Sequence, residues 1–200
     1  MKKRAAIIKR KTRETDITVK LAVDGSGKAK IDTGIGFLDH MLELFAFWGF
    51  FDLQISVGKC DFKVDIHHTN EDIGIVLGQS FKQALGDKKG IRRIGYAQVP
   101  MEEVVGNVVL DICGRGFIDF EADSSKIMKT ENYEFEYAQH FFDGFAKQLG
   151  MNLNISVKDA NRDLHATLEP VFKAFGLALD QATQIDPRRK GVPSTKGVID

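Results

Sequence analysis

The chain has 200 residues, and its 28 lysine and arginine residues are balanced by 28 aspartate and glutamate residues. Hydrophobic residues make up 43%, enough for the core of one domain or two small ones, which excludes a disordered chain. The zero net charge argues against a protein held to nucleic acid mainly by phosphate contacts, because such proteins carry a basic excess.

No segment is predicted to span a membrane. The most apolar run, residues 35–51, is interrupted by Asp39 and His40, whereas a span needs about 20 mostly apolar residues. The two cysteines, Cys60 and Cys113, are too few for a disulfide framework and are interpreted as small buried apolar residues. We therefore expect a soluble cytoplasmic protein with no membrane or nucleic-acid partner.

The first half of the chain predicts strands and two helices in a fixed order. The basic segment 2–13 is interpreted as a solvated or edge strand rather than a nucleic-acid arm. Alternating apolar residues predict a strand over Ile17–Val23. An apolar helix over Leu38–Trp48, a strand over Leu53–Val57 and a helix over Thr69–Leu85 follow.

The second half predicts the same order of elements. A strand over Val104–Ile112 precedes a helix over Phe135–Leu149, a strand over Leu153–Val157 and a helix over Leu164–Ala182. The tail Asp186–Asp200 contains two prolines and two glycines and is predicted to be extended.

The two halves are copies of one unit. The strand sequence LQISV of residues 53–57 returns as LNISV one hundred residues later, and further pairs keep an offset of 100 or 98. These pairs are His40 with His140, His67 with His165, Glu71 with Glu169 and Gly78 with Gly176. The sequence therefore predicts an α+β fold built by internal duplication, with two sheets each covered by helices on one face. We divide it into half-repeats 1–92 and 93–185 and a C-terminal segment 186–200.

The strongest chemical motif is His67-His68-Thr69-Asn70-Glu71. Residues four apart share a helix face, so His67 and Glu71 can bind one metal ion. His68 points about 100° further round the helix, toward a different partner. The alternative is that each histidine is structural, which is the common case for a single histidine.

The duplication favours metal binding. His165 and Glu169 repeat the spacing, and His40 and His140 are duplicated on the preceding helices, so these elements contain all five histidines of the chain. Structural histidines have no reason to follow the internal repeat. Imidazole and carboxylate ligands suit Mn, Fe or Zn, and the absence of a cysteine ligand favours Mn.

Three segments combine glycine with basic residues, which are the components of phosphate sites. They are residues 90–95, 114–116 and 194–197. None has the spacing of a nucleotide-binding P-loop, and any one taken alone is more readily an ordinary turn. Lys173, on the helix of His165, either reaches a phosphate or lies in solvent.

With these motifs the chain resembles the imidazoleglycerol-phosphate dehydratase family, the lyases of histidine biosynthesis. The resemblance runs from Arg13 to Gly197. The segments that carry it are 33–42, 67–72, 84–91, 100–103, 114–116, 172–174 and 194–197.

The resemblance implies a fold of the ribosomal protein S5 domain 2 type, in which each half is a four-stranded sheet backed by two helices. It also implies a cubic homo-oligomer of twenty-four subunits with two Mn ions per subunit, bound at subunit interfaces. The implied ligands are His67, Glu71 and His140 at one site and His40, His68, His165 and Glu169 at the other.

The implied reaction removes water from imidazoleglycerol phosphate to give imidazole-acetol phosphate. The proton removed is not acidic, so the metal ions would act as Lewis acids and as a template. Glu14 matches the glutamate that moves the proton, and His40, His68 and Glu71 are assigned with it to the catalytic group. The residues that match phosphate-binding positions are Arg93, Arg115, Lys173, Ser194, Thr195 and Lys196.

Two residues depart from the family pattern. Ala166 follows His165 where the family usually has a second histidine, so one metal site would lack an imidazole. Trp48 stands where the family has a histidine, and indole neither accepts a proton nor binds a metal. Two alternatives to the lyase follow: a relative that has lost turnover and persists as a metal-binding or assembly protein, and a dinuclear hydrolase of a small phosphorylated molecule.

Overall fold

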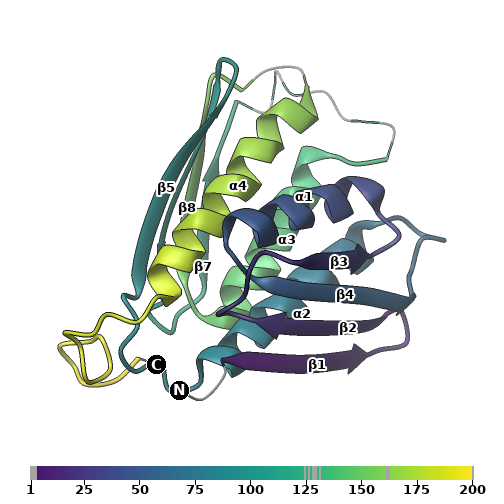
Figure 1. The fold of residues 1–200 in the computed structure, drawn as a ribbon. Helices are drawn as coiled ribbons and strands as arrows, with labels where there is room; N and C mark the ends of the chain where they lie inside the picture. The colour runs from purple at the N-terminus through teal and green to yellow at the C-terminus, as the bar shows by residue number, and fades with distance from the viewer. Residues whose placement is uncertain are drawn as a thin grey trace.

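The computed structural model describes residues 4–123, 125, 127, 130, 132–160 and 163–199. Its first half forms a four-stranded sheet in the order β1-β2-β4-β3, with the basic β1 at the edge (Figure 1). Neighbouring strands are antiparallel except β3 and β4, which are parallel. The elements of this half are β1 (Ala5–Lys11), β2 (Asp16–Ala22), β3 (Ala29–Asp32), α1 (Gly36–Trp48), β4 (Asp52–Lys59) and α2 (His67–Leu85).

The second half repeats this topology. Its sheet has the order β5-β6-β8-β7, and here too the last two strands, β7 and β8, are parallel. Its elements are β5 (Ile94–Met101), β6 (Val104–Asp111), β7 (Phe117–Glu121), α3 (Phe135–Leu149), β8 (Asn152–Lys158) and α4 (Leu164–Thr183). The predicted duplication and the predicted α+β class are confirmed.

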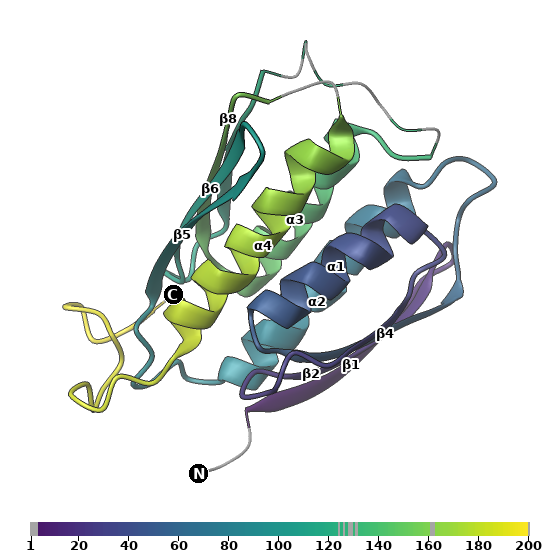
Figure 2. The same ribbon diagram turned by 45° about the horizontal axis from the view of Figure 1, so that its top comes forward.

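The four helices lie between the two sheets (Figure 2). Helix α1 packs against α4, and α2 packs against α3, so each helix pair joins the two copies. The inward side chains of the strands explain this arrangement. Ile17, Val19 and Leu21 of β2 are at most 3% exposed, which leaves an apolar face that the helices must cover.

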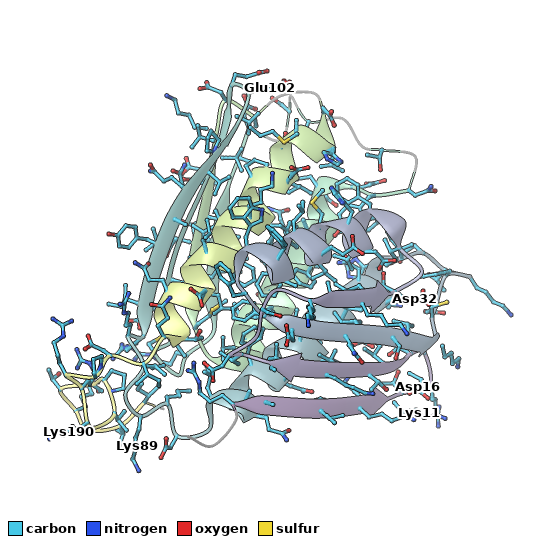
Figure 3. All side chains as sticks on the ribbon, viewed as in Figure 1. Lys11, Asp16, Asp32, Lys89, Glu102 and Lys190 are labelled. Atoms are coloured by element: carbon cyan, nitrogen blue, oxygen red, sulfur yellow. The ribbon has the colours of Figure 1, made fainter. Side chains whose placement is uncertain are left out.

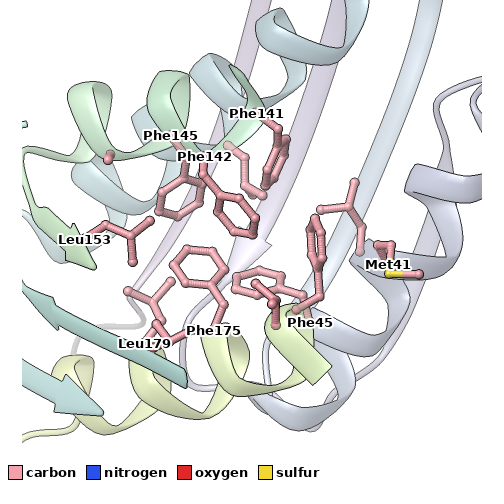
Figure 4. Close-up of a cluster of buried hydrophobic side chains, with 14 of the residues drawn as sticks. Met41, Phe45, Phe141, Phe142, Phe145, Leu153, Phe175 and Leu179 are labelled. Atoms are coloured by element: carbon pink, nitrogen blue, oxygen red, sulfur yellow. The ribbon is translucent and has the colours of Figure 1, made fainter. Parts of the chain in front are cut away.

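Phenylalanine rings fill the space between the helices (Figure 4). Phe45 of α1 stacks on Phe175 of α4, with ring centroids 5.1 Å apart, and Phe145 of α3 contacts both rings. Offset and edge-to-face contacts of this kind add to the free energy of burial. One continuous aromatic core therefore connects the two halves.

Two glycines let the helix pairs approach closely. A Cβ at Gly78 would lie 2.5 Å from the carbonyl oxygen of Phe145, and a Cβ at Gly176 would lie 2.5 Å from that of Phe45. These are equivalent contacts of the duplicated unit, and a methyl group does not fit at either. The glycine pair found in the sequence therefore sets the distance between the helices.

The helices match their predicted positions within two residues at each end, and α3 has the predicted bounds. Residues 186–199 contain no helix or strand. Cys113 is buried as predicted, but the prediction for Cys60 was wrong, because it lies exposed after β4. The limits at residues 92 and 185 stay a prediction. No helix in the described part of the chain is both long and apolar enough to cross a membrane.

Candidate active site

The first histidine cluster joins the two copies. His40 of α1 stacks on His165 of α4 with ring centroids 5.1 Å apart, and His165 Nε2 lies 2.6 Å from Glu169 Oε2. One ligand atom from each of His40, His165 and Glu169 lies within 4.8 Å of the others. All three side chains are partly buried, so they form a ready group of metal ligands.

Lys173 is the fourth member of this cluster. Its Nζ lies 2.5 Å from Glu169 Oε1, one turn further along α4. Burial by itself raises the pKa of Glu169, but the hydrogen bonds from Lys173 and His165 outweigh it and lower the pKa below its usual value. Glu169 is therefore held as a carboxylate, the form that binds a cation.

The second cluster uses the equivalent residues. His67 of α2 and His140 of α3 have ring centroids 4.2 Å apart, and His67 Nε2 lies 3.8 Å from Glu71 Oε2. The helix pair α2–α3 therefore places His67 next to both His140 and Glu71. The structure brings together six of the seven predicted metal ligands in two groups of three.

Two aspartates, Asp65 and Asp163, fix the positions of His67 and His165, each of which follows its aspartate by two residues. The backbone N–H of His67 donates to Asp65 at 2.7 Å, and that of His165 donates to Asp163 at 2.8 Å. Asp163 is the N-cap of α4, and both aspartates accept from an amide at the start of a helix that has no partner within the helix. Both histidines therefore lie in the first turn of their helix, with Glu71 and Glu169 one turn later.

His68 lies apart from the cluster of His40, His165 and Glu169, to which the resemblance assigned it. Its Nδ1 is 3.1 Å from Asp61 Oδ2, and Glu14 joins this group, with one ligand atom of each residue within 4.8 Å of the others. The hydrogen bond to Asp61 and the nearby charge of Glu14 raise the pKa of His68. Its ring is exposed and available to a partner outside the chain.

All the residues predicted to bind phosphate except Lys173 line one pocket of about 170 Å³. This pocket is formed by the residue before β5, the loop between β6 and β7, and the C-terminal segment. Its walls are Arg93, Cys113, Arg115, Ser194, Thr195, Lys196 and Val198. Guanidinium and ammonium groups converging on one small space are suited to an anion.

Arg93 is held rigidly in this pocket. Its Nε and Nη2 donate to the two oxygens of Asp111 at 2.5 and 2.8 Å, and its Nη1 donates to the carbonyl oxygen of Pro193 at 2.9 Å. The hydrogen bonds to Asp111 raise the pKa of Arg93. One side chain therefore ties the C-terminal segment to β6.

The two residues that depart from the family pattern have different surroundings. Ala166 is 6% exposed, next to His165 on α4. Trp48 lies at the opposite end of α1 from His40, two turns or about 12 Å along the helix, and packs against Phe47. Ala166 therefore lies beside the first histidine cluster, whereas Trp48 is remote from that cluster on its own chain.

The sequence analysis missed four residues that shape the site. His68 lies 3.1 Å from Asp61, Arg93 donates to Asp111, and Thr15, the residue after Glu14, donates to Asp72. Asp72 stands in the histidine motif and Thr15 follows Glu14, but the partner of each lies far away along the chain. No signal of spacing connects such residues.

These features define the class of protein: an internally duplicated α+β chain with a candidate dinuclear metal site and an anion pocket. The model of the family described as imidazoleglycerol-phosphate dehydratase matches residues 33–179. The chain belongs to this family, whose members are hydro-lyases of histidine biosynthesis. Membership supports the dehydratase over the alternatives of an inactive relative and a hydrolase.

Relatives and solved structures agree with this assignment. The chain is 49% identical to an imidazoleglycerol-phosphate dehydratase of Geobacter metallireducens, covering 98% of this chain and 99% of the relative. It is 50% identical to one of Acetivibrio thermocellus, covering 96% and 97%. The crystal structure of the Staphylococcus aureus enzyme superposes with a TM-score of 0.80 at 32% identity, covering 91% of this chain and 99% of the other. For the Pyrococcus furiosus enzyme in complex with (S)-C348 the TM-score is 0.79 at 32% identity, covering 96% and 99%.

Proposed function

We propose that this chain removes water from imidazoleglycerol phosphate and forms imidazole-acetol phosphate in histidine biosynthesis. The observation that carries the proposal is the two sets of neighbouring histidine and glutamate side chains together with the basic pocket, in a chain that belongs to the dehydratase family. A hydrolase would need the same ligand types, but family membership does not support one.

The phosphate group is proposed to bind in the basic pocket. Arg93, Arg115 and Lys196 supply positive charge, and Ser194 and Thr195 supply hydroxyl donors. Because two hydrogen bonds to Asp111 fix the Arg93 guanidinium, its other N–H groups are already oriented before the substrate binds. Binding the phosphate then holds the reacting carbon in a defined position.

Glu14 is proposed to remove and return the proton. Its carboxylate lies beside His68 and Asp61 in a turn between two strands, so it is exposed to a substrate that approaches from outside the chain. A general base must be held within hydrogen-bonding reach of the proton that it takes. His40, His68 and Glu71 would orient the imidazole end of the substrate through the metal centre.

The donor sets fit divalent metal ions, since imidazole and carboxylate groups meet in the first cluster and lie next to one another in the second. We assign His40, His165 and Glu169, with His68, to one Mn²⁺ and His67, Glu71 and His140 to the other. Bound Mn²⁺ supplies Lewis-acid stabilisation of the charge that develops on the imidazole ring. The second set has only three protein ligands, since Ala166 stands at the position equivalent to His68.

We further propose that the complete site forms between subunits. The backbone N–H of Arg93 donates to the carbonyl oxygen of Ala182. Ala182 is seventeen residues beyond His165 on α4, or about 25 Å at 1.5 Å per residue. A small substrate is too short to bridge that distance, so the pocket and the cluster it serves belong to different chains. A homo-oligomer of twenty-four subunits in the cytoplasm, which the family resemblance implies, is part of this proposal.

The test is dehydration of imidazoleglycerol phosphate by purified protein, with Mn²⁺ added or with a chelator. We expect turnover that depends on Mn²⁺ and a sedimentation velocity far above that of a 22.3 kDa monomer. Folded, metal-loaded protein without turnover would contradict the proposal and favour the inactive relative. The variant Ala166→His then shows whether the missing imidazole is the reason.

A further inference from the structure

We propose that Thr15 and Asp72 form a buried contact that positions Glu14, so that the helix of the metal-binding histidines also fixes the proton-transfer group. Thr15 Oγ1 donates to Asp72 Oδ2 at 2.5 Å, and this contact joins the β1–β2 turn to α2. The inference rests on the proposed function, which assigns proton transfer to Glu14. Thr15 and Asp72 are positioning residues, because neither one reaches the exposed surface where Glu14 stands.

The turn that carries Glu14 is closed by its own hydrogen bonds. The backbone N–H of Thr12 donates to the carbonyl oxygen of Thr15 at 2.8 Å. Thr12 Oγ1 accepts from the backbone N–H of Glu14 at 3.1 Å and from that of Thr15 at 2.9 Å. The flanking residues Lys11 and Asp16 pair across the strands with 3.5 Å between Nζ and Oδ2 (Figure 3). The turn therefore moves as one unit.

The contact that anchors this unit is buried. Thr15 is 0% exposed and Asp72 is 9% exposed. The second oxygen of Asp72 forms an ion pair with Arg10 of β1, with Nη1 and Oδ1 2.7 Å apart but outside hydrogen-bonding angles. A buried carboxylate is stable only when its oxygens have partners. Moving the turn or β1 away from Asp72 would remove one of these partners and would therefore cost free energy.

The anchor links two parts of the candidate active site. Asp72 follows Glu71 directly on α2 and stands one turn after His68. A helix is rigid at this length, so fixing Thr15 to Asp72 sets the distance from Glu14 to His68. Proton transfer is sensitive to such distances, and a misplacement of about 1 Å can reduce a rate about 10²-fold.

The test compares Thr15→Val with Thr15→Ser. Valine keeps the shape of threonine but removes the donor, whereas serine keeps the hydroxyl. We expect Thr15→Val to lower kcat about 10²-fold with unchanged KM and Mn²⁺ content, and Thr15→Ser to restore kcat to within about threefold of the wild type. The matched control is Ser80→Ala, which removes another fully buried hydroxyl from α2, and it should leave kcat unchanged.

Wild-type kcat in Thr15→Val would overturn the inference, as would a parallel loss of kcat, substrate affinity and metal, because that pattern indicates a general role in folding. If Thr15→Val does not fold, Asp72→Asn serves in its place, with an expected loss in kcat of about tenfold. Amide hydrogen exchange in residues 12–15 tests the anchor without any assay of activity. We expect faster exchange in Thr15→Val, and unchanged exchange would overturn the inference even if the wild-type protein proved not to be a dehydratase. Absence of turnover in the wild type alone would contradict only the proposed function.

Discussion

Replacing Glu169 by glutamine tests the charge balance of the first histidine cluster. Glu169 Oε1 lies 2.5 Å from Lys173 Nζ, and the two side chains are 13% and 20% exposed. Breaking a fully buried ion pair costs about 3–5 kcal/mol, and the partial exposure of this pair reduces the loss to about 2 kcal/mol. For a chain of this length that lowers the melting temperature by about 4–8 °C.

The effect of Glu169→Gln depends on pH with a defined sign. The pKa of Glu169 is lowered in the folded protein from 4.5, so its carboxylate stabilises the fold fully above that value. This stabilisation is lost as the pH falls through the folded pKa, when the wild-type carboxyl group is protonated too. The difference in melting temperature between wild type and variant should therefore be largest near pH 7 and should close below pH 4.5.

Metal binding gives a second measurement on the same variant. Mn²⁺ at about 100 times its Kd stabilises a folded protein by about 2.7 kcal/mol for each site that it fills. The variant should therefore gain less stability from added Mn²⁺ than the wild type, because its first cluster no longer binds the ion. The matched control is Glu43→Gln, an exposed glutamate of α1, which should behave as wild type. An unchanged melting temperature in chelator at pH 7, or a difference that does not shrink as the pH falls below 4.5, would refute this reasoning.

The remaining predictions concern turnover, phosphate binding and packing. Glu71→Gln should reduce metal content and turnover together, whereas Glu14→Gln should retain metal and lose turnover; loss of metal from the Glu14 variant would contradict its assigned role. Arg115→Ala should raise KM about tenfold or more by removing a charge-assisted contact of about 1.5–3 kcal/mol, with little change in bound metal; steady-state kinetics check this. Gly176→Ala should lower the melting temperature by about 4 °C or more, because its Cβ would lie 2.5 Å from a backbone oxygen. Gly36→Ala, where nothing lies within 4 Å, is its control.

Much of the fold was predictable because local sequence patterns indicate most of the helices and strands, and because the same order of elements occurs twice in the chain. The strand and helix periods placed β2, β4, β6, β8 and the four helices, and the repeated LQISV and LNISV strands showed the duplication. The spacing of His67 with Glu71 and of His165 with Glu169 followed from helix geometry. The edge strands β3, β5 and β7 have no strong pattern of their own, and their existence was implied by the resemblance alone.

The sequence by itself determined which side chains are available and how they are spaced within one helix, because those properties depend only on neighbours along the chain. Tertiary structure decided which helices meet. Helix α1 packs on α4 rather than on α2, so His40 joins His165 and Glu169 from the other copy, and His67 joins His140. These contacts join residues up to 129 positions apart. Such contacts depend on how apolar helix faces dock and on the glycines where the helices meet, and no local sequence pattern encodes them.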